Sequence, residues 1–389
     1  MKRRFATFIL HISITCIFIF VNSGCVPTKQ PSPETAKGTL INSVWEYNLE
    51  NAENASEVNS TYPAITWKES TPEEQGMDSI LLLKTDNIIT NSPPDLNSVL
   101  VIRNGYIVYE KYYQGFNKDK VNNMKSCTKS IISTLIGIAI DKKYLSGIDQ
   151  KLADFYPEYF ENETDTNKKQ ISIKHLLTMT AGLKWDEGSD TWPWTTNSNP
   201  NKYVIDKPMS STPGTNWNYS SGSAHLLSGI ITKTSKISTL EFAQKYLFSP
   251  MGITDASWEK QANDEYYCGA GNLYLTPRDA AKIGLLYLQK GLWGNQQLVP
   301  EKWIEDSLTK QNDGYPPKGE YGYLWWINKY GGYTTYFAAG YGGQFIFIVP
   351  ALNMIIVTTA SWDKPSTNIS YQLVNDYIVP SVINTMPVK

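Results

Sequence analysis

Strand-forming sequence lies near both ends of this chain, and a long helical and loop-rich stretch separates the two parts. Residues 98–110 hold two β-rich runs joined by Asn104-Gly105, a strong hairpin signal. Later runs that predict strands lie at 323–327, 334–339, 344–349 and 354–360. We therefore expect an α+β fold, with one antiparallel sheet built from both chain ends and flanked by helices, and an inserted, mainly helical lobe at about 145–260.

Three segments give the clearest helix signals. Residues 127–142 are apolar almost all round, which predicts a helix buried in the middle of the protein. Thr276, Pro277 and Asp279 supply an N-cap, a first-turn proline and a first-turn acid for a helix to about Lys290. The stretch 368–383 predicts a helix broken near Pro380, and shorter helical patches lie within the inserted lobe.

The N-terminus is typical of an exported protein. Basic residues at 2–4 precede an apolar stretch at 5–21, which is shorter than a bilayer-spanning helix requires. The following Asn-Ser-Gly-Cys25 resembles a bacterial lipobox, although that motif prefers Leu where this chain has Asn22. We expect a signal peptide at 1–24, lipidation of Cys25 and a polar tether at 25–60, so that a hydrolase domain at 61–389 is anchored to the membrane outside the cytoplasm; an uncleaved anchor is the alternative.

Charge and residue counts exclude several classes of site. The formal net charge is −2 and becomes more negative without the basic signal, which argues against a nucleic-acid partner. Beyond the signal and Cys25, the chain keeps only Cys127, Cys268, His175 and His225. A disulfide framework and a zinc site are therefore not expected, and we predict no metal and no cofactor.

A serine followed three residues later by a lysine occurs four times, and Ser126 with Lys129 is the pair that opens the buried helix. One helical turn places both side chains on the same face. Burial favours a neutral amine, which can take the hydroxyl proton, and the helix dipole favours developing negative charge. A capping serine and a lysine that reaches solvent remain the alternative at this point.

Several short motifs accompany this pair in a fixed order. They are Ser126-Cys127-Thr128-Lys129, His175 to Leu183, Pro213-Gly214 with Tyr219-Ser220-Ser221-Gly222, Gly269-Ala270-Gly271 with Thr276 to Asp279, and Gly340-Tyr341-Gly342-Gly343. Over about residues 70–385 the chain resembles the serine β-lactamase and penicillin-binding superfamily, in its class C-like branch of esterases, D-aminopeptidases and 6-aminohexanoate-dimer hydrolases. The resemblance implies a β-lactamase/transpeptidase-like fold with its active site where the sheet meets the helical lobe.

The resemblance also implies roles for individual residues. Ser126 is the expected nucleophile, Lys129 its base and Tyr219 a proton relay to the leaving group. The third family motif aligns with Ala338-Ala339-Gly340, so that the backbone amides of Ser126 and Tyr341 would form the oxyanion hole and no side-chain cation would stand beside it.

Other residues near these motifs receive weaker assignments. Ser221 stands where the family often has Asn, and Ser221, Gly340 and Trp217 are expected to bind substrate. His175 and His225 are expected to be structural. Trp185, Trp192, Trp194 and Trp217 either wall the cleft or pack the loops.

Together these features predict a cofactor-free serine hydrolase acting on small esters or amides. Because Ala338 and Ala339 offer neither charge nor hydroxyl to a substrate carboxylate, we expect weak β-lactamase and D-Ala-D-Ala carboxypeptidase activity. Those two activities are one alternative, and a non-catalytic tethered penicillin-binding or sensor protein is the other. Nothing in the sequence predicts the oligomeric state.

Overall fold

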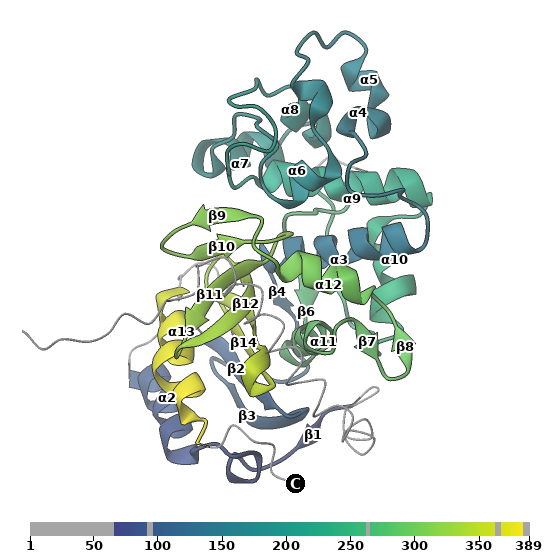
Figure 1. Ribbon diagram of the computed structural model, residues 1–389. Coiled ribbons are helices and arrows are strands. Elements are labelled where there is room, and N and C mark those ends of the chain that lie inside the picture. The colour runs from purple at the N-terminus through teal and green to yellow at the C-terminus, as the bar shows by residue number, and fades with distance from the viewer. Residues whose placement is uncertain (1–65, 92–95, 262–264, 362–366, 384–389) are drawn as a thin grey trace, which may run out of the picture. The chain divides into compact units, whose positions relative to one another are not determined.

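Both ends of the described chain contribute strands to one sheet (Figure 1). The computed structural model describes residues 66–91, 96–261, 265–361 and 367–383. Within them the main sheet has nine strands in the order β1-β3-β2-β14-β13-β12-β11-β10-β9. All neighbours are antiparallel except the parallel pair of β1 and β3. This arrangement confirms the predicted fold class.

The strands of this sheet come from two separate parts of the sequence. The first part contains β1 (Lys68–Glu69), β2 (Leu96–Arg103) and β3 (Tyr106–Tyr112). The second contains β9 (Asn312–Tyr315), β10 (Gly319–Tyr321), β11 (Trp326–Tyr330), β12 (Tyr333–Gly340), β13 (Gln344–Val349) and β14 (Met354–Ala360). The two parts meet where β14 pairs with β2, for example at Ile356 and Val101.

The predicted hairpin at 98–110 is confirmed. Asn104 and Gly105 join β2 to β3 with φ angles of 52° and 83°, in the left-handed region that a tight two-residue hairpin turn requires. At the other end of the chain, β13 and β14 have the bounds predicted from the sequence. The bounds predicted for the strand at 323–327 were wrong, since β11 starts only at Trp326 and runs to Tyr330. Leu324 has a φ of 61°, and its amide donates to Leu177 O rather than to a strand (3.0 Å).

Helices cover both faces of the sheet, which explains why its central strands are apolar without alternation. On one face, Tyr371 of α13 (Thr367–Leu373) packs on Phe345, with ring centroids 4.8 Å apart. On the other face, α11 (Pro277–Leu288) packs against β13 and β14. Thr276 caps α11 by accepting from Asp279 N, as the sequence predicted.

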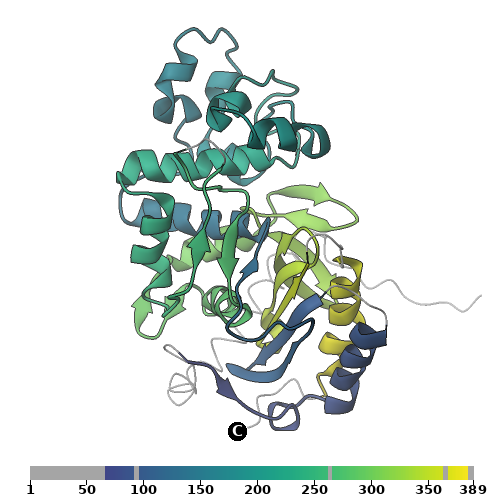
Figure 2. The same ribbon diagram turned by 180° about the vertical axis from the view of Figure 1, so that it is seen from behind.

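The helix predicted at 127–142 is α3 (Cys127–Asp141), and its side chains are buried up to Ala139. It lies against β12 and against α9 (Ser221–Ser235). Helices α3 and α9 thus form one of the contacts between the sheet and the inserted lobe, as both views show (Figures 1 and 2).

The remaining elements lie in the inserted lobe and around the sheet. The inserted lobe contains α4 (Leu152–Phe155), α5 (Pro157–Phe160), α6 (Ile173–Leu177), α7 (Glu187–Thr195), α8 (Pro200–Ile205), α9 and α10 (Thr239–Ala243). Outside it lie α2 (Ser79–Asn91) and α12 (Glu301–Leu308). Two small sheets consist of β4 (Asn122–Asn123), β6 (Leu273–Leu275) and β5 (Ser257–Trp258), and of β7 (Leu292–Trp293) with β8 (Gln296–Gln297). The predicted C-terminal helix continues after α13 as a π-turn at Val374–Ile378 and a 3₁₀ turn at Val379–Ser381.

The predicted signal peptide, Cys25 and the tether lie outside the described residues. Among the residues that are described, no helix is long and apolar enough to cross a membrane.

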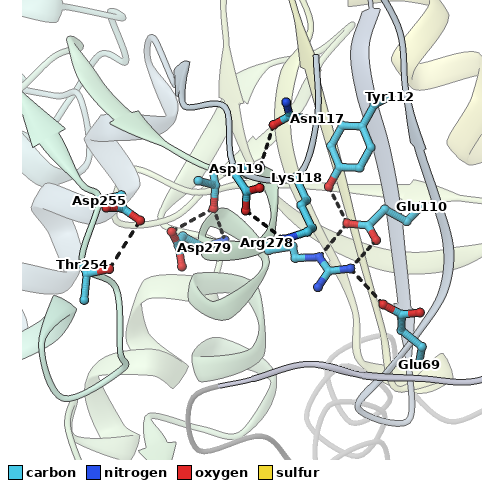
Figure 3. A network of polar contacts seen from close by, with 11 residues as sticks. Glu69, Glu110, Tyr112, Asn117, Lys118, Asp119, Thr254, Asp255, Arg278 and Asp279 are labelled. Carbon is cyan, nitrogen blue, oxygen red and sulfur yellow. Dashed lines mark hydrogen bonds and ion pairs between the residues drawn. The ribbon is translucent and has the colours of Figure 1, made fainter. Parts of the chain in front are cut away.

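An ion-pair network joins the start of α11 to the sheet (Figure 3). The Arg278 guanidinium donates to both carboxylate oxygens of Glu110 on β3 (2.8 and 2.6 Å) and to Glu69 on β1 (3.0 Å). Burial raises the pKa of Glu110, but hydrogen bonds from Arg278 and Tyr112 outweigh it and hold that pKa below its usual value. The sequence placed Arg278 correctly in the first turn of a helix; its side chain is engaged with carboxylates rather than free in solvent.

We predict that Arg278→Met lowers the free energy of unfolding by about 2 to 3 kcal/mol at neutral pH, because Glu110 then keeps a partly buried charge without its partner. A carboxyl whose pKa is depressed by folding loses its stabilising effect as pH falls, so the difference from the wild type shrinks below about pH 4. Urea unfolding at both pH values measures this. Lys302→Met, which removes an exposed pair with Asp306, is the control and costs at most about 0.5 kcal/mol.

Candidate active site

Ser126 stands at the N-terminus of α3, where a tight backbone turn presents it. The preceding Lys125 has a φ of 48°, and its amide donates to Asn123 Oδ1 (2.9 Å). The Ser126 side chain makes no capping hydrogen bond to α3. Its hydroxyl therefore does not serve as a helix cap.

Lys129 lies one turn into α3 and is 1% exposed, so it does not reach solvent. Its Nζ contacts three oxygens from three segments: Ser126 Oγ (2.8 Å), Ser221 Oγ (3.0 Å) and Ala270 O (3.0 Å). A buried amine requires such partners, because burying it without them would be costly. The structure thus brings together the serine and lysine singled out in the sequence.

A carboxylate that the sequence analysis missed supports this arrangement. The Ser221 hydroxyl and amide both donate to Glu187, the amide at 3.0 Å. The Trp185 indole donates to the same carboxylate (2.7 Å). Glu187 is the first residue of α7, and only its place in a helical first turn is visible in the sequence. A chain of contacts therefore runs from Glu187 through Ser221 and Lys129 to Ser126.

The Gly269-Ala270-Gly271 loop supplies the third partner of Lys129, and His225 holds this loop in place. The buried His225 accepts a hydrogen bond at Nδ1 from Gly269 N (3.3 Å). His175 accepts at Nδ1 from Ser172 N (3.1 Å) and so caps the start of α6. Both contacts agree with the structural roles predicted for the two histidines.

A cluster of aromatic rings surrounds Tyr219, whose ring centroid lies 5.0 Å from Lys129 Nζ. Tyr219 stacks on Trp326 (6.1 Å, 27° between planes) and contacts Trp217 (6.2 Å). Tyr321 packs against Trp217 and Trp326, and burial raises its pKa well above the usual value. Trp217 is therefore part of the wall beside Tyr219.

The other tryptophans singled out in the sequence differ from Trp217. Trp185 and Trp194 are buried and pack edge to face (5.8 Å), and Trp192 is 75% exposed. Trp185 and Trp194 thus pack the lobe.

The end of β12 lies directly beside the segment that precedes Ser126. A Cβ atom on Gly340 would stand 2.4 Å from Met124 O and 3.1 Å from Lys125 Cβ, so only glycine allows this approach. Within the described residues, the backbone amides of Ser126 and Tyr341 donate no hydrogen bond. Both amides are thus available as donors, and Tyr341 directly follows the glycine that lies against Met124 and Lys125.

Ala338 and Ala339 of the third motif are buried on β12. A cation from another element packs on the aromatic rings beside Tyr219. Lys318, between β9 and β10, lies with Nζ 4.3 Å from the ring centroid of Trp326. Burial, and to a smaller extent the charge of Lys129, lower its pKa. The weak activity expected on carboxylate-bearing substrates was argued from the third motif alone, without this lysine.

Comparisons with known proteins show the family of this chain. The sequence model of the beta-lactamase family matches residues 97–372. The chain belongs to the beta-lactamase family. It is 22% identical over 293 residues to the 6-aminohexanoate-dimer hydrolase of Paenarthrobacter ureafaciens, covering 70% of this chain and 74% of that protein. It is 25% identical over 187 residues to the lovastatin esterase of Penicillium rubens, covering 43% and 46% of the two chains.

The fold is also similar to solved structures of this family. A putative 6-aminohexanoate-dimer hydrolase from Bacillus anthracis aligns with a TM-score of 0.63 and 18% identity, over 80% of this chain and 85% of that one. Among the described residues of the present chain, no group of three or more His, Cys, Asp or Glu could hold a metal ion.

We predict that Gly340→Ala lowers the free energy of unfolding by about 1 to 3 kcal/mol, because the added methyl group overlaps Met124 O and forces the backbone apart. Gly271→Ala is the matched control, since its Cβ would meet Lys125 O only at 3.8 Å, an ordinary contact. Urea unfolding of the two variants tests the close approach; equal stability of both would contradict it.

Proposed function

We propose that this serine hydrolase of the beta-lactamase family forms an acyl-enzyme at Ser126, with Lys129 as the general base and Tyr219 as the proton relay. The observation that carries the proposal is the short contact of Lys129 Nζ with Ser126 Oγ (2.8 Å) inside a buried cluster. The substrate class is small esters or amides.

The hydrogen bonds around Lys129 support a role as base. The Ser221 hydroxyl donates its hydrogen bond to Glu187, so its oxygen accepts from Lys129, and the Ala270 carbonyl accepts as well. A neutral amine uses its two N–H groups on these acceptors and directs its lone pair at the Ser126 hydroxyl. After proton transfer, the third N–H points at Ser126 Oγ. The same positions of the heavy atoms therefore serve both protonation states.

The reaction proceeds in two steps. Ser126 Oγ gives its proton to Lys129 and attacks the carbonyl carbon, and the carbonyl oxygen becomes an oxyanion between the amides of Ser126 and Tyr341. The bond to the leaving group breaks as that group takes the proton through Tyr219. Water then attacks the acyl-enzyme, and the same groups act as general base and general acid. This step releases the carboxylic acid product and restores Ser126.

The substrate class rests on the names of the relatives. One relative is named for hydrolysis of an aminohexanoate dimer and another for lovastatin ester cleavage. Amide and ester hydrolysis pass through the same tetrahedral intermediate, so one site can serve both.

We predict that Ser126→Ala lowers kcat on a 4-nitrophenyl ester by at least about 1000-fold and abolishes labelling by a fluorophosphonate, because the nucleophilic oxygen is gone. Intact mass measures the label and peptide sequencing its position. Ser133→Ala on the same helix is the control, because its buried hydroxyl has no hydrogen-bond partner and its loss leaves the rate within about two-fold.

Lys129→Met is expected to lower kcat about as much as Ser126→Ala does. The two residues act as a unit, so the effects of replacing them are not additive. Near-normal rates in this variant would require another base. A wild-type protein that neither hydrolyses esters nor takes the label would instead favour the non-catalytic binder.

We also propose that the mature chain begins at a lipidated Cys25 and is anchored to the membrane outside the cytoplasm. The basic, apolar and small-residue order of residues 2–25 supports this. Cys25→Ser is expected to move the protein from the detergent phase to the aqueous phase on Triton X-114 partitioning. Retention in the detergent phase would indicate an uncleaved anchor.

A further inference from the structure

Lys318 is held in a defined place beside the aromatic cluster. It follows Pro316 and Pro317, whose rings fix φ and stiffen the turn between β9 and β10. The Lys318 amide donates to Tyr315 O (2.7 Å), and its carbonyl accepts from Asn328 Nδ2 (2.9 Å). The backbone of Lys318 is thus fixed on both sides.

The Lys318 side chain has an aromatic partner but no acidic one. Its ammonium lies 4.3 Å from the centroid of Trp326, and in the described part of the chain it forms no ion pair and donates no hydrogen bond. The two other charged groups described at the site are matched within the protein: Lys129 has three oxygens, and Glu187 has three donors. Lys318 therefore leaves a positive charge unmatched.

This charge lies close to the reacting groups. Trp326 stacks on Tyr219, and the Tyr219 ring lies 5.0 Å from Lys129 Nζ. Each ring of this stacked pair thus has a lysine ammonium beside it. Burial and the charge of Lys129 lower the pKa of Lys318 to about 8, so the amine is still mostly protonated at neutral pH and a bound anion would favour this form.

We propose that Lys318 is the specificity residue of the site and pairs with a carboxylate of the substrate, so that the enzyme favours anionic esters or amides over neutral ones. The inference rests on the proposed function of Ser126. It gives Lys318 the place left open by Ala338 and Ala339, from a different element of the fold. The Trp326 ring lies beside the ammonium, and within the described residues no hydrogen bond uses its N–H donors.

A purely structural role for Lys318 would have a different result. If the lysine only packed on Trp326, its replacement would disturb Tyr219 and slow all substrates alike. A role in recognition instead changes the ratio of kcat/KM between an anionic substrate and its neutral counterpart. This ratio is therefore the measurement to make.

Two substrate pairs place the carboxylate on either side of the scissile bond. The acyl pair is 4-nitrophenyl hydrogen adipate and 4-nitrophenyl methyl adipate. The leaving-group pair is 4-carboxyphenyl acetate and 4-(methoxycarbonyl)phenyl acetate. Each rate is taken at pH 7 in low salt, after subtraction of the rate of Ser126→Ala.

We expect Lys318→Met to lower the anionic-to-neutral ratio by roughly 10- to 100-fold for at least one pair, which is the range of a charge-assisted hydrogen bond. Lys318→Arg keeps the charge and is expected to keep most of the preference. Lys329→Met, on the exposed side of neighbouring β11, removes the same charge elsewhere and is expected to leave the ratio within about two-fold.

Three results would overturn the inference. An unchanged ratio for both pairs in Lys318→Met, or an equal loss on anionic and neutral esters, would show that Lys318 does not recognise the anion. An equal change in Lys329→Met would assign the effect to net charge. In all three cases Ser126-dependent turnover persists, whereas loss of that turnover in the wild type would remove the proposed function itself.

Discussion

The burial of one amine organises the centre of this molecule. Lys129 is removed from solvent, and each of its three oxygen partners belongs to a different segment. These are the start of α3, the start of α9 and the loop that leads into β6. Because an unpartnered buried amine would cost several kcal/mol, the three segments hold their positions together. The Ser126 hydroxyl is thereby fixed at hydrogen-bond distance before any substrate arrives, and such preorganisation is what catalysis requires.

Many elements of the fold can be predicted from the sequence because local interactions determine them. The Asn104-Gly105 turn, the apolar run of α3 and the cap of α11 depend on neighbouring residues, and these elements were predicted correctly. The edge of the sheet was not predicted. Residues 311–318 contain Gly314, Pro316 and Pro317, which favour a loop, and the pairing of β9 with β10 arises only from tertiary contacts such as Asn312 with Thr178 O.

The candidate site also contains residues that local sequence predicts and residues that only the fold brings together. Ser126 and Lys129 are one helical turn apart, so their proximity follows from periodicity. Glu187 and Lys318 reach the cluster from distant segments whose sequence carries no motif, and only the fold brings them there. The third-motif alignment was informative about the backbone, since Gly340 does lie against Met124. It carried no information about Lys318, because that lysine belongs to another hairpin.

The pairing of β2 with β14 has a consequence for biosynthesis. During translation β2 and β3 emerge before the inserted lobe, and β14, the strand that completes them, emerges after it. Until then one long apolar edge of β2 has no neighbour and is open to non-native pairing. The sheet therefore closes only after β14 has been made, and a polypeptide shortened before Met354 would leave the ribosome without the strand that links its two halves.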